Sequence, residues 1–206
     1  TRGRDLSGTR RNKKVVERAP APYLSAAQRS EICDLGRKVC AHVGYECAGT
    51  VEFLMDMDSG KFYFIEVNPR VQVEHTVTEE VTGIDIVQAQ ILIAEGKTLF
   101  EATGKARQED IYLTGHALQT RITTEDPQNN FIPDYGRITA YRAANGMGIR
   151  LDGGTAYAGG VITRYYDSLL VKVTASAQTP EKAIARMDRA LRELDRALEL
   201  SRIHIS

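Results

Sequence analysis

Alternating apolar and polar positions predict a β-hairpin in the first half of the chain. The segment 49–55 (GTVEFLM) and the apolar run 61–65 (KFYFI) are typical of strands, and 58–60 (DSG) has the composition of a tight turn. We expect a three-residue loop there and a buried second strand. In that register Glu52 lies directly opposite Glu66, the residue that follows the second run.

Apolar residues at helical spacing predict three helices, at 25–44, at 78–96 and from 179 onward. Ser25 and Gln28 have the spacing of a capping box at the first of these helices. For the last helix, Thr179 is the expected N-cap and Pro180 the first residue, and the expected inward positions are Ile184, Met187, Leu191 and Leu194.

The second half of the chain has a different pattern. A polar stretch near 102–110 precedes short β-like runs separated by glycine and proline turns, so we place the boundary of two domains there, 1–107 and 108–206. The predicted strands are 116–124, 137–142, 148–151 and 169–175. The fold class is therefore α+β, with mainly antiparallel strands in the second domain.

Charged side chains follow the predicted hairpin at once, in the sequence EVNPRVQVEH (66–75). Since side chains alternate along a strand, Glu66, Asn68 and Arg70 share one face, and Gln72 and Glu74 continue it if the chain stays extended. This pattern also fits the solvated face of an edge hairpin, and for a single carboxylate that interpretation is favoured.

For the whole set we favour a metal site. Glu52 and Glu66 repel each other across the hairpin unless a hard cation lies between them, and Asn68 adds an amide oxygen. Arg70 can bind an anion and Glu74 can accept a proton. The residues alone therefore predict Mg²⁺ with nucleotide phosphates.

Composition narrows the class of partner. The formal net charge is +0, so neither nucleic acid nor a membrane surface has electrostatic support, and no apolar run has the length of a membrane span. Cys33, Cys40 and Cys47 include no CxxC pair, and we interpret them as structural thiols in a reducing compartment, the cytoplasm.

Two long motifs carry a resemblance to a known family. FIEVNPRVQVEHTVTE (64–79) and GHALQTRITTEDP (115–127) resemble the biotin carboxylase component of biotin-dependent carboxylases. The segments 132–142 and 165–172 are most similar to the pyruvate-acting members of bacterial type. The resemblance covers 10–193 and implies the C-terminal part of an ATP-grasp fold, followed by a biotin carboxylase C-terminal domain.

The resemblance implies a role for each matching residue. Glu52 and Glu66, with Asn68 beside them, match the magnesium ligands, and Glu74 matches the general base that deprotonates bicarbonate. The residues that match the bicarbonate-binding group are Arg70, Gln72 and Val73, the last through its backbone amide.

Two further matches concern biotin and phosphate. Arg121 corresponds to the arginine that steadies the enolate of biotin, and Lys14 to a lysine near bicarbonate and the transferred phosphate. Leu6 and Thr9 depart from the family pattern, which has a cysteine and a glutamine there. Residues 195–206 also depart from it.

The implied activity is ATP-dependent carboxylation of biotin by bicarbonate through carboxyphosphate, with biotin, ATP and Mg²⁺ (or Mn²⁺) as cofactors, in a protein that converts pyruvate to oxaloacetate. The implied partners are a biotinylated carrier domain and a carboxyltransferase domain of the same parent chain, which is expected to form a homo-oligomer. An acyl-CoA carboxylase, another ATP-grasp ligase and a non-catalytic fragment are the alternatives. The glycine-rich ATP loop of the family is missing, so we expect the isolated chain to be inactive.

Overall fold

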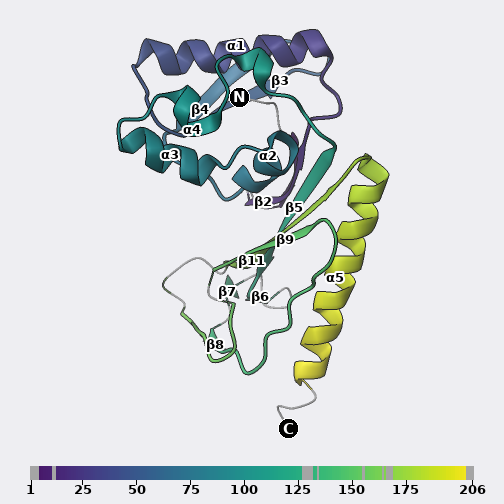
Figure 1. Ribbon diagram of the computed structural model, residues 1–206. Coiled ribbons are helices and arrows are strands. Elements are labelled where there is room, and N and C mark those ends of the chain that lie inside the picture. The colour runs from purple at the N-terminus through teal and green to yellow at the C-terminus, as the bar shows by residue number, and fades with distance from the viewer. Residues whose placement is uncertain are drawn as a thin grey trace. The chain divides into compact units, whose positions relative to one another are not determined.

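The computed structural model describes residues 5–10, 13–126, 132–133, 135–154, 156–163, 165 and 169–202, of which 5–10, 13, 14, 126, 132, 133 and 195–202 are described by their backbone alone. The contacts divide the chain into two units (Figure 1). Arg18–Thr114 belong to the first unit, whereas Leu6–Glu17 pack with the residues from Gly115 onward in the second. The domain boundary near residue 107 stays a prediction.

The first unit combines one hairpin with helices (Figure 1). Its elements are α1 (Ala26–His42), β3 (Thr50–Met55), β4 (Phe62–Asn68), α2 (His75–Thr82), α3 (Ile86–Ala94), α4 (Leu99–Thr103) and the 3₁₀ turn Gln108–Asp110. The predicted capping box of α1 is confirmed: the Ser25 hydroxyl accepts from the Gln28 amide at 3.2 Å, and Gln28 Oε1 accepts from the Ser25 amide at 3.0 Å.

The hairpin has the predicted register at its open end and a different loop at its closed end. Glu52 pairs with Glu66, as expected. The loop, however, comprises 57–60 rather than 58–60, because Met55 pairs with Phe62. An irregularity after Glu52 inserts one extra residue into β4 and restores the register. The predicted three-residue loop was wrong. The extra residue in β4 offsets the extra residue in the loop, so that Glu52 still pairs with Glu66.

Polar contacts explain the four-residue loop. The amide of Asp56 donates to the carbonyl of Lys61 at 2.9 Å, and the amide of Gly60 donates to the carbonyl of Asp56 at 2.8 Å. The Ser59 hydroxyl donates to Asp56 Oδ2 at 2.6 Å, and this hydrogen bond, with that from the Asp58 amide, lowers the pKa of the Asp56 carboxyl. Asp56 therefore closes the loop one residue earlier than the glycine pattern predicted.

The predicted helix 78–96 is two helices. Gly83, with φ +67°, ends α2 in the left-handed conformation, and Asp85 caps α3 by accepting from the Gln88 amide at 2.7 Å. The helix also begins at His75, three residues earlier than the expected cap Thr78. Apolar residues at helical spacing continue across the break, and for this reason the sequence alone predicted one helix.

The second unit contains a five-stranded sheet in the order β1-β2-β5-β11-β9. The strands are β1 (Asp5–Arg10), β2 (Lys13–Ala19), β5 (His116–Thr123), β9 (Ile149–Gly153) and β11 (Leu169–Ala177), with the short pairs β6 (Glu125–Asp126) with β7 (Ile132–Pro133) and β8 (Gly136–Arg137) with β10 (Val161–Ile162). β11 runs antiparallel to both β5 and β9, as expected for this half. The strand predicted at 137–142 is limited to its first residue.

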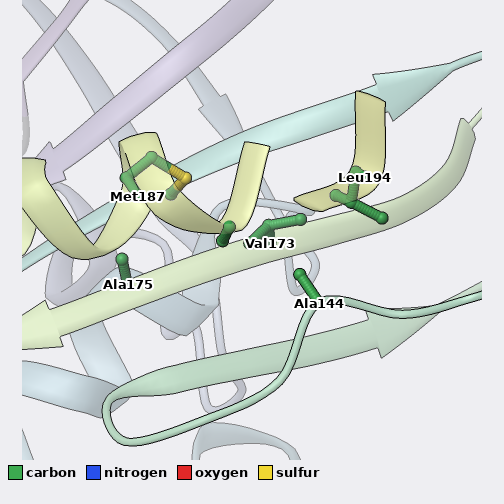
Figure 2. Packing of buried hydrophobic residues seen from close by; sticks show 6 residues of the cluster. Ala144, Val173, Ala175, Met187 and Leu194 are labelled. Atoms are coloured by element: carbon green, nitrogen blue, oxygen red, sulfur yellow. The ribbon is translucent and has the colours of Figure 1, made fainter. Parts of the chain in front are cut away.

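Helix α5 (Pro180–Arg202) covers one face of this sheet and forms the core of the unit with it. Met187 and Leu194 point from the helix toward Val173 and Ala175 on β11 (Figure 2). The predicted inward position Ile184 is 55% exposed, because Ala183 and Ala190 take part in the inward row instead. The small alanine side chains let the helix approach the strand closely.

Within the described residues, no helix combines the length and the apolar character needed to cross a membrane. None of the three cysteines forms a disulfide bond; Cys33 is buried and Cys47 exposed.

We predict that Val173→Ala destabilises the second unit by about 2–3 kcal/mol, because Val173 is fully buried and its loss leaves a cavity under α5. Urea unfolding followed by circular dichroism measures the change. Ile184→Ala, at an exposed position of the covering helix α5, is the control, and its expected effect is below about 0.5 kcal/mol. Similar losses in the two variants would contradict the position of this core.

Candidate functional site

The paired carboxylates of the hairpin are held by two amides. Asn68 Nδ2 donates to Glu52 Oε1 at 3.1 Å and to Glu66 Oε1 at 2.9 Å, so one amide group bridges the two acids. Gln72 Nε2 donates to the same Glu52 oxygen at 3.1 Å. These donors offset part of the repulsion between the acids and hold their oxygens close together.

This donor set fits a hard divalent cation. Two carboxylates and an amide carry oxygen ligands, and Mg²⁺ is usually bound by one or two carboxylates together with water and phosphate oxygens. Asn68 would have to turn its amide so that Oδ1 rather than Nδ2 faces the ion. The described residues contain no cluster of three or more His, Cys, Asp or Glu suited to a metal, so a closed protein cage is not what this part of the chain offers.

The segment 69–74 does not stay extended, contrary to expectation. After β4 the chain turns, with the Arg70 amide donating to the carbonyl of Asn68 at 2.8 Å, and it enters α2 at His75. The turn is what brings Gln72 back toward Glu52, so the two residues meet through a fold of the chain and not through strand alternation. The condition under which Gln72 and Glu74 would continue the strand face is therefore not met.

β4 is also not the buried strand that its composition suggested. Tyr63, Phe64 and Ile65 are 55%, 55% and 47% exposed, and Glu66 is exposed as well. The acidic pair therefore has one side open to a ligand, which suits a site that must admit a nucleotide.

The residues expected to bind and deprotonate bicarbonate lie on this turn. Arg70 is exposed and donates from Nη1 to the carbonyl of Val71 at 3.2 Å. Gln72 is 7% exposed, and its Oε1 is buried with no hydrogen-bond partner among the described residues. Glu74 is 2% exposed and occupies the N-cap position of α2, where the helix dipole favours negative charge.

In the second unit the structure links Arg121 to a buried acid. Arg121 Nη2 donates to Glu17 Oε1 at 2.8 Å, and Gln119 Nε2 donates to Glu17 Oε2 at 2.8 Å. Glu17 and Gln119 are fully buried, whereas the Arg121 side chain is 21% exposed. One carboxylate thus fixes the arginine at the sheet, and the arginine side chain stays partly exposed.

Sequence reasoning missed Glu17 and Gln119. A signal existed for Gln119, because residues two apart on a strand share a face and Arg121 is the next residue on that face. For Glu17 the signal was weak, since an acid after two valines is common on surface strands. Lys14 belongs to β2, but its side chain lies outside the described part of the chain.

The structure thus brings together Glu52, Glu66, Asn68 and Gln72 in the first unit, and Arg121, Glu17 and Gln119 in the second. A charged site for an anion or metal and a half-buried, oriented arginine are typical of enzymes that activate phosphates and oxyanions.

Two family comparisons also divide the chain in two, although Glu17, which packs with the second unit, falls in the first match. Residues 2–102 match the family described as carbamoyl-phosphate synthase L chain, ATP binding domain, and residues 119–196 match the biotin carboxylase C-terminal domain. The order of these two domains along one chain is that of a biotin carboxylase, and the predicted ATP-grasp-type fold is confirmed.

The similar proteins define the family more closely. The chain is 57% identical over 190 residues to pyruvate carboxylase 1 of Caenorhabditis elegans and 53% identical over 191 residues to pyruvate carboxylase of Bacillus subtilis (strain 168), in each case over 92% of this chain and 16% of the relative. The structure of Rhizobium etli pyruvate carboxylase T882A with acetyl coenzyme A matches with a TM-score of 0.87 and 68% identity, over 92% of this chain and 18% of that one.

The chain therefore belongs to the pyruvate carboxylase family and corresponds to part of its biotin carboxylase region. It spans about one sixth of the length of the curated relatives that it matches.

We predict that Glu17→Ala destabilises the second unit by about 3–5 kcal/mol, because it leaves the Arg121 guanidinium and the Gln119 amide at the sheet without their acceptor. Chemical denaturation measures the loss. Asp188→Ala, which removes an exposed ion pair with Arg192, is the control and should leave stability nearly unchanged. If both variants unfold at the same denaturant concentration, the contact does not stabilise the sheet.

Proposed function

We propose that this chain is the part of a pyruvate carboxylase that carboxylates biotin, using ATP and bicarbonate. The observation that supports this most directly is the pair Glu52 and Glu66, joined by the Asn68 amide in a chain of the biotin carboxylase family. In the whole protein the carboxyl group would pass to pyruvate and give oxaloacetate.

Bicarbonate activation is the role of the turn 70–74. Bicarbonate is a poor nucleophile until it loses a proton, and Glu74 accepts that proton. The anion pairs with the Arg70 guanidinium, with the Val73 amide as a further donor. Gln72 Oε1, which lacks a hydrogen-bond partner among the described side chains, accepts the hydroxyl of bicarbonate before the proton leaves.

The first bond to form joins a bicarbonate oxygen to the γ-phosphorus of ATP, and the bond that breaks releases ADP. Mg²⁺, when bound, would neutralise the charge on the transferred phosphoryl group. Glu52 and Glu66 would hold the ion, with the Asn68 amide oxygen as a further ligand. Mn²⁺ can take the same ligands, and Lys14 is assigned to the phosphate on the basis of its sequence match.

Carboxyphosphate would break into CO₂ and phosphate, and biotin, when bound, would supply the ureido nitrogen that takes up the CO₂ while the released phosphate takes its proton. Arg121 would stabilise the negative charge on the ureido oxygen. Glu17 holds the Arg121 guanidinium, and Gln119 holds Glu17, so the arginine is oriented in advance.

The remaining functions belong to other parts of the parent protein. The proposal requires a carrier domain that bears biotin and a carboxyltransferase domain that binds pyruvate, and it places a homo-oligomeric parent in the cytoplasm. Its support is that the similar pyruvate carboxylases are several times longer than this chain.

We predict that Glu52→Gln and Glu66→Gln, made in the full-length protein, each raise the Mg²⁺ concentration needed for half-maximal ATP cleavage at least about tenfold, because a charged ligand is lost. A magnesium titration of bicarbonate-dependent ATP cleavage measures the change. Glu31→Gln on the exposed side of α1 is the control. Wild-type magnesium dependence in both variants would remove the metal assignment.

The two halves of the mechanism predict different losses. In the full-length protein, Glu74→Gln should abolish bicarbonate-dependent ATP cleavage and biotin carboxylation together, because both need deprotonated bicarbonate. Arg121→Ser should depress biotin carboxylation by at least about tenfold more than the slow ATP cleavage seen without biotin, since its target charge arises only on biotin.

Steady-state assays of ATP cleavage with and without free biotin test this difference. A melting curve and the exposed-site variant Arg37→Ser serve as controls. An equal decline in both assays for Arg121→Ser, together with lower stability, would assign Arg121 a structural role only.

A further inference from the structure

We propose that His75 and Glu79 are positioning residues that fix the bicarbonate-binding turn 70–74 by anchoring one of its peptide groups. The inference rests on the proposed function and names side chains to which that function assigns no role. Both lie on α2, in the first unit, immediately after the general base Glu74.

The imidazole of His75 contacts the backbone of the turn. Its Nδ1 lies 2.7 Å from the carbonyl oxygen of Gln72, and since a carbonyl only accepts, Nδ1 carries the hydrogen. The backbone amide of His75 donates to the same oxygen at 3.2 Å. One residue therefore gives two hydrogen bonds to the Gln72 carbonyl.

This anchor sets the direction of a neighbouring donor. The peptide that joins Gln72 and Val73 is planar and trans, so its C=O and N–H point in opposite directions. When His75 holds the Gln72 carbonyl, the Val73 N–H must point to the other side of the peptide plane. That N–H is the backbone donor proposed for bicarbonate.

Glu79 lies at the other end of the ring. His75 Nε2 lies 3.7 Å from Glu79 Oε2, one helical turn along α2, and the two side chains are 12% and 7% exposed. Glu79 is itself fixed, because its Oε1 accepts from the amide of Ile86 at 2.7 Å at the start of α3. When the imidazole is protonated, this carboxylate pairs with it and ties it to the junction of the two helices.

The helix that carries the pair is firmly packed. Thr76 and Val77 are fully buried and Val81 is 1% exposed, so α2 provides a fixed base for the turn. An amide that is already oriented binds an anion without an additional entropy cost for ordering the turn. The pair therefore acts on bicarbonate binding through the shape of the turn and touches no reacting atom.

The test compares three substitutions of His75 in the full-length protein. His75→Asn places an amide donor near the position of Nδ1 and keeps the hydrogen bond, whereas His75→Gln extends its amide toward the position of Nε2, and His75→Ala has no donor. We expect His75→Ala and His75→Gln to raise the KM for bicarbonate about five- to tenfold, the size of one hydrogen bond, and His75→Asn to restore most of it.

Other measurements separate positioning from general destabilisation. The KM for ATP should change less than about twofold, and kcat at saturating bicarbonate should stay near that of the wild type. Glu79→Gln keeps an acceptor for Ile86 but removes the charge facing His75, so a smaller rise in the bicarbonate KM is expected. His42→Ala, at an exposed site on α1, is the matched control.

The inference and the proposed function fail in different ways. If the wild-type full-length protein cleaves ATP with bicarbonate and loses this activity in Glu74→Gln, the proposed function stands. An unchanged bicarbonate KM in His75→Ala would then overturn the positioning role alone, as would equal losses in all three His75 variants with a lower melting temperature. Absence of bicarbonate-dependent cleavage in the wild-type protein would overturn both.

Discussion

The facing carboxylates of Glu52 and Glu66 are the constraint on which the first unit depends. Strand pairing forces the two acids to the same position across the hairpin, so their repulsion cannot be relieved by moving one strand without losing the register. In this chain the Asn68 and Gln72 amides offset the repulsion. A cation can displace a neutral amide at lower cost than a paired lysine or arginine, which suits the metal proposed for this site.

The second unit differs from the first in how the charge of its acidic side chain is compensated. There a charged pair, Glu17 with Arg121, is satisfied within the protein, and the Gln119 amide takes the second carboxylate oxygen. A buried ion pair of this kind gives little net stability, but it fixes the direction of the arginine. The first unit keeps its charge for a ligand, while the second uses its charge to orient a side chain.

How much of this follows from the sequence depends on the range of each interaction. Strand alternation is local and predicted the pairing of Glu52 with Glu66, but this register holds only because the bulge in β4 offsets a loop that is one residue longer than predicted. The turn after β4 was not predictable, since Pro69 is compatible with an extended chain as well as a turn. Glu17 was missed because its partners are more than one hundred residues away in the chain.

The local sequence pattern identified the residues of the candidate site but did not predict their arrangement, and the turn 70–74 shows the reason. A strand is held by its neighbour along its whole length, whereas this turn depends on side-chain contacts such as Gln72 to Glu52 and His75 to the Gln72 carbonyl. The first contact uses a Glu52 oxygen that the proposed metal could also take. A cation at the acidic pair would then compete with Gln72 for Glu52, whereas the contact from His75 involves no proposed metal ligand. Because α2 supplies that contact, the proposed bicarbonate donors could keep their position while the ligands of the metal rearrange.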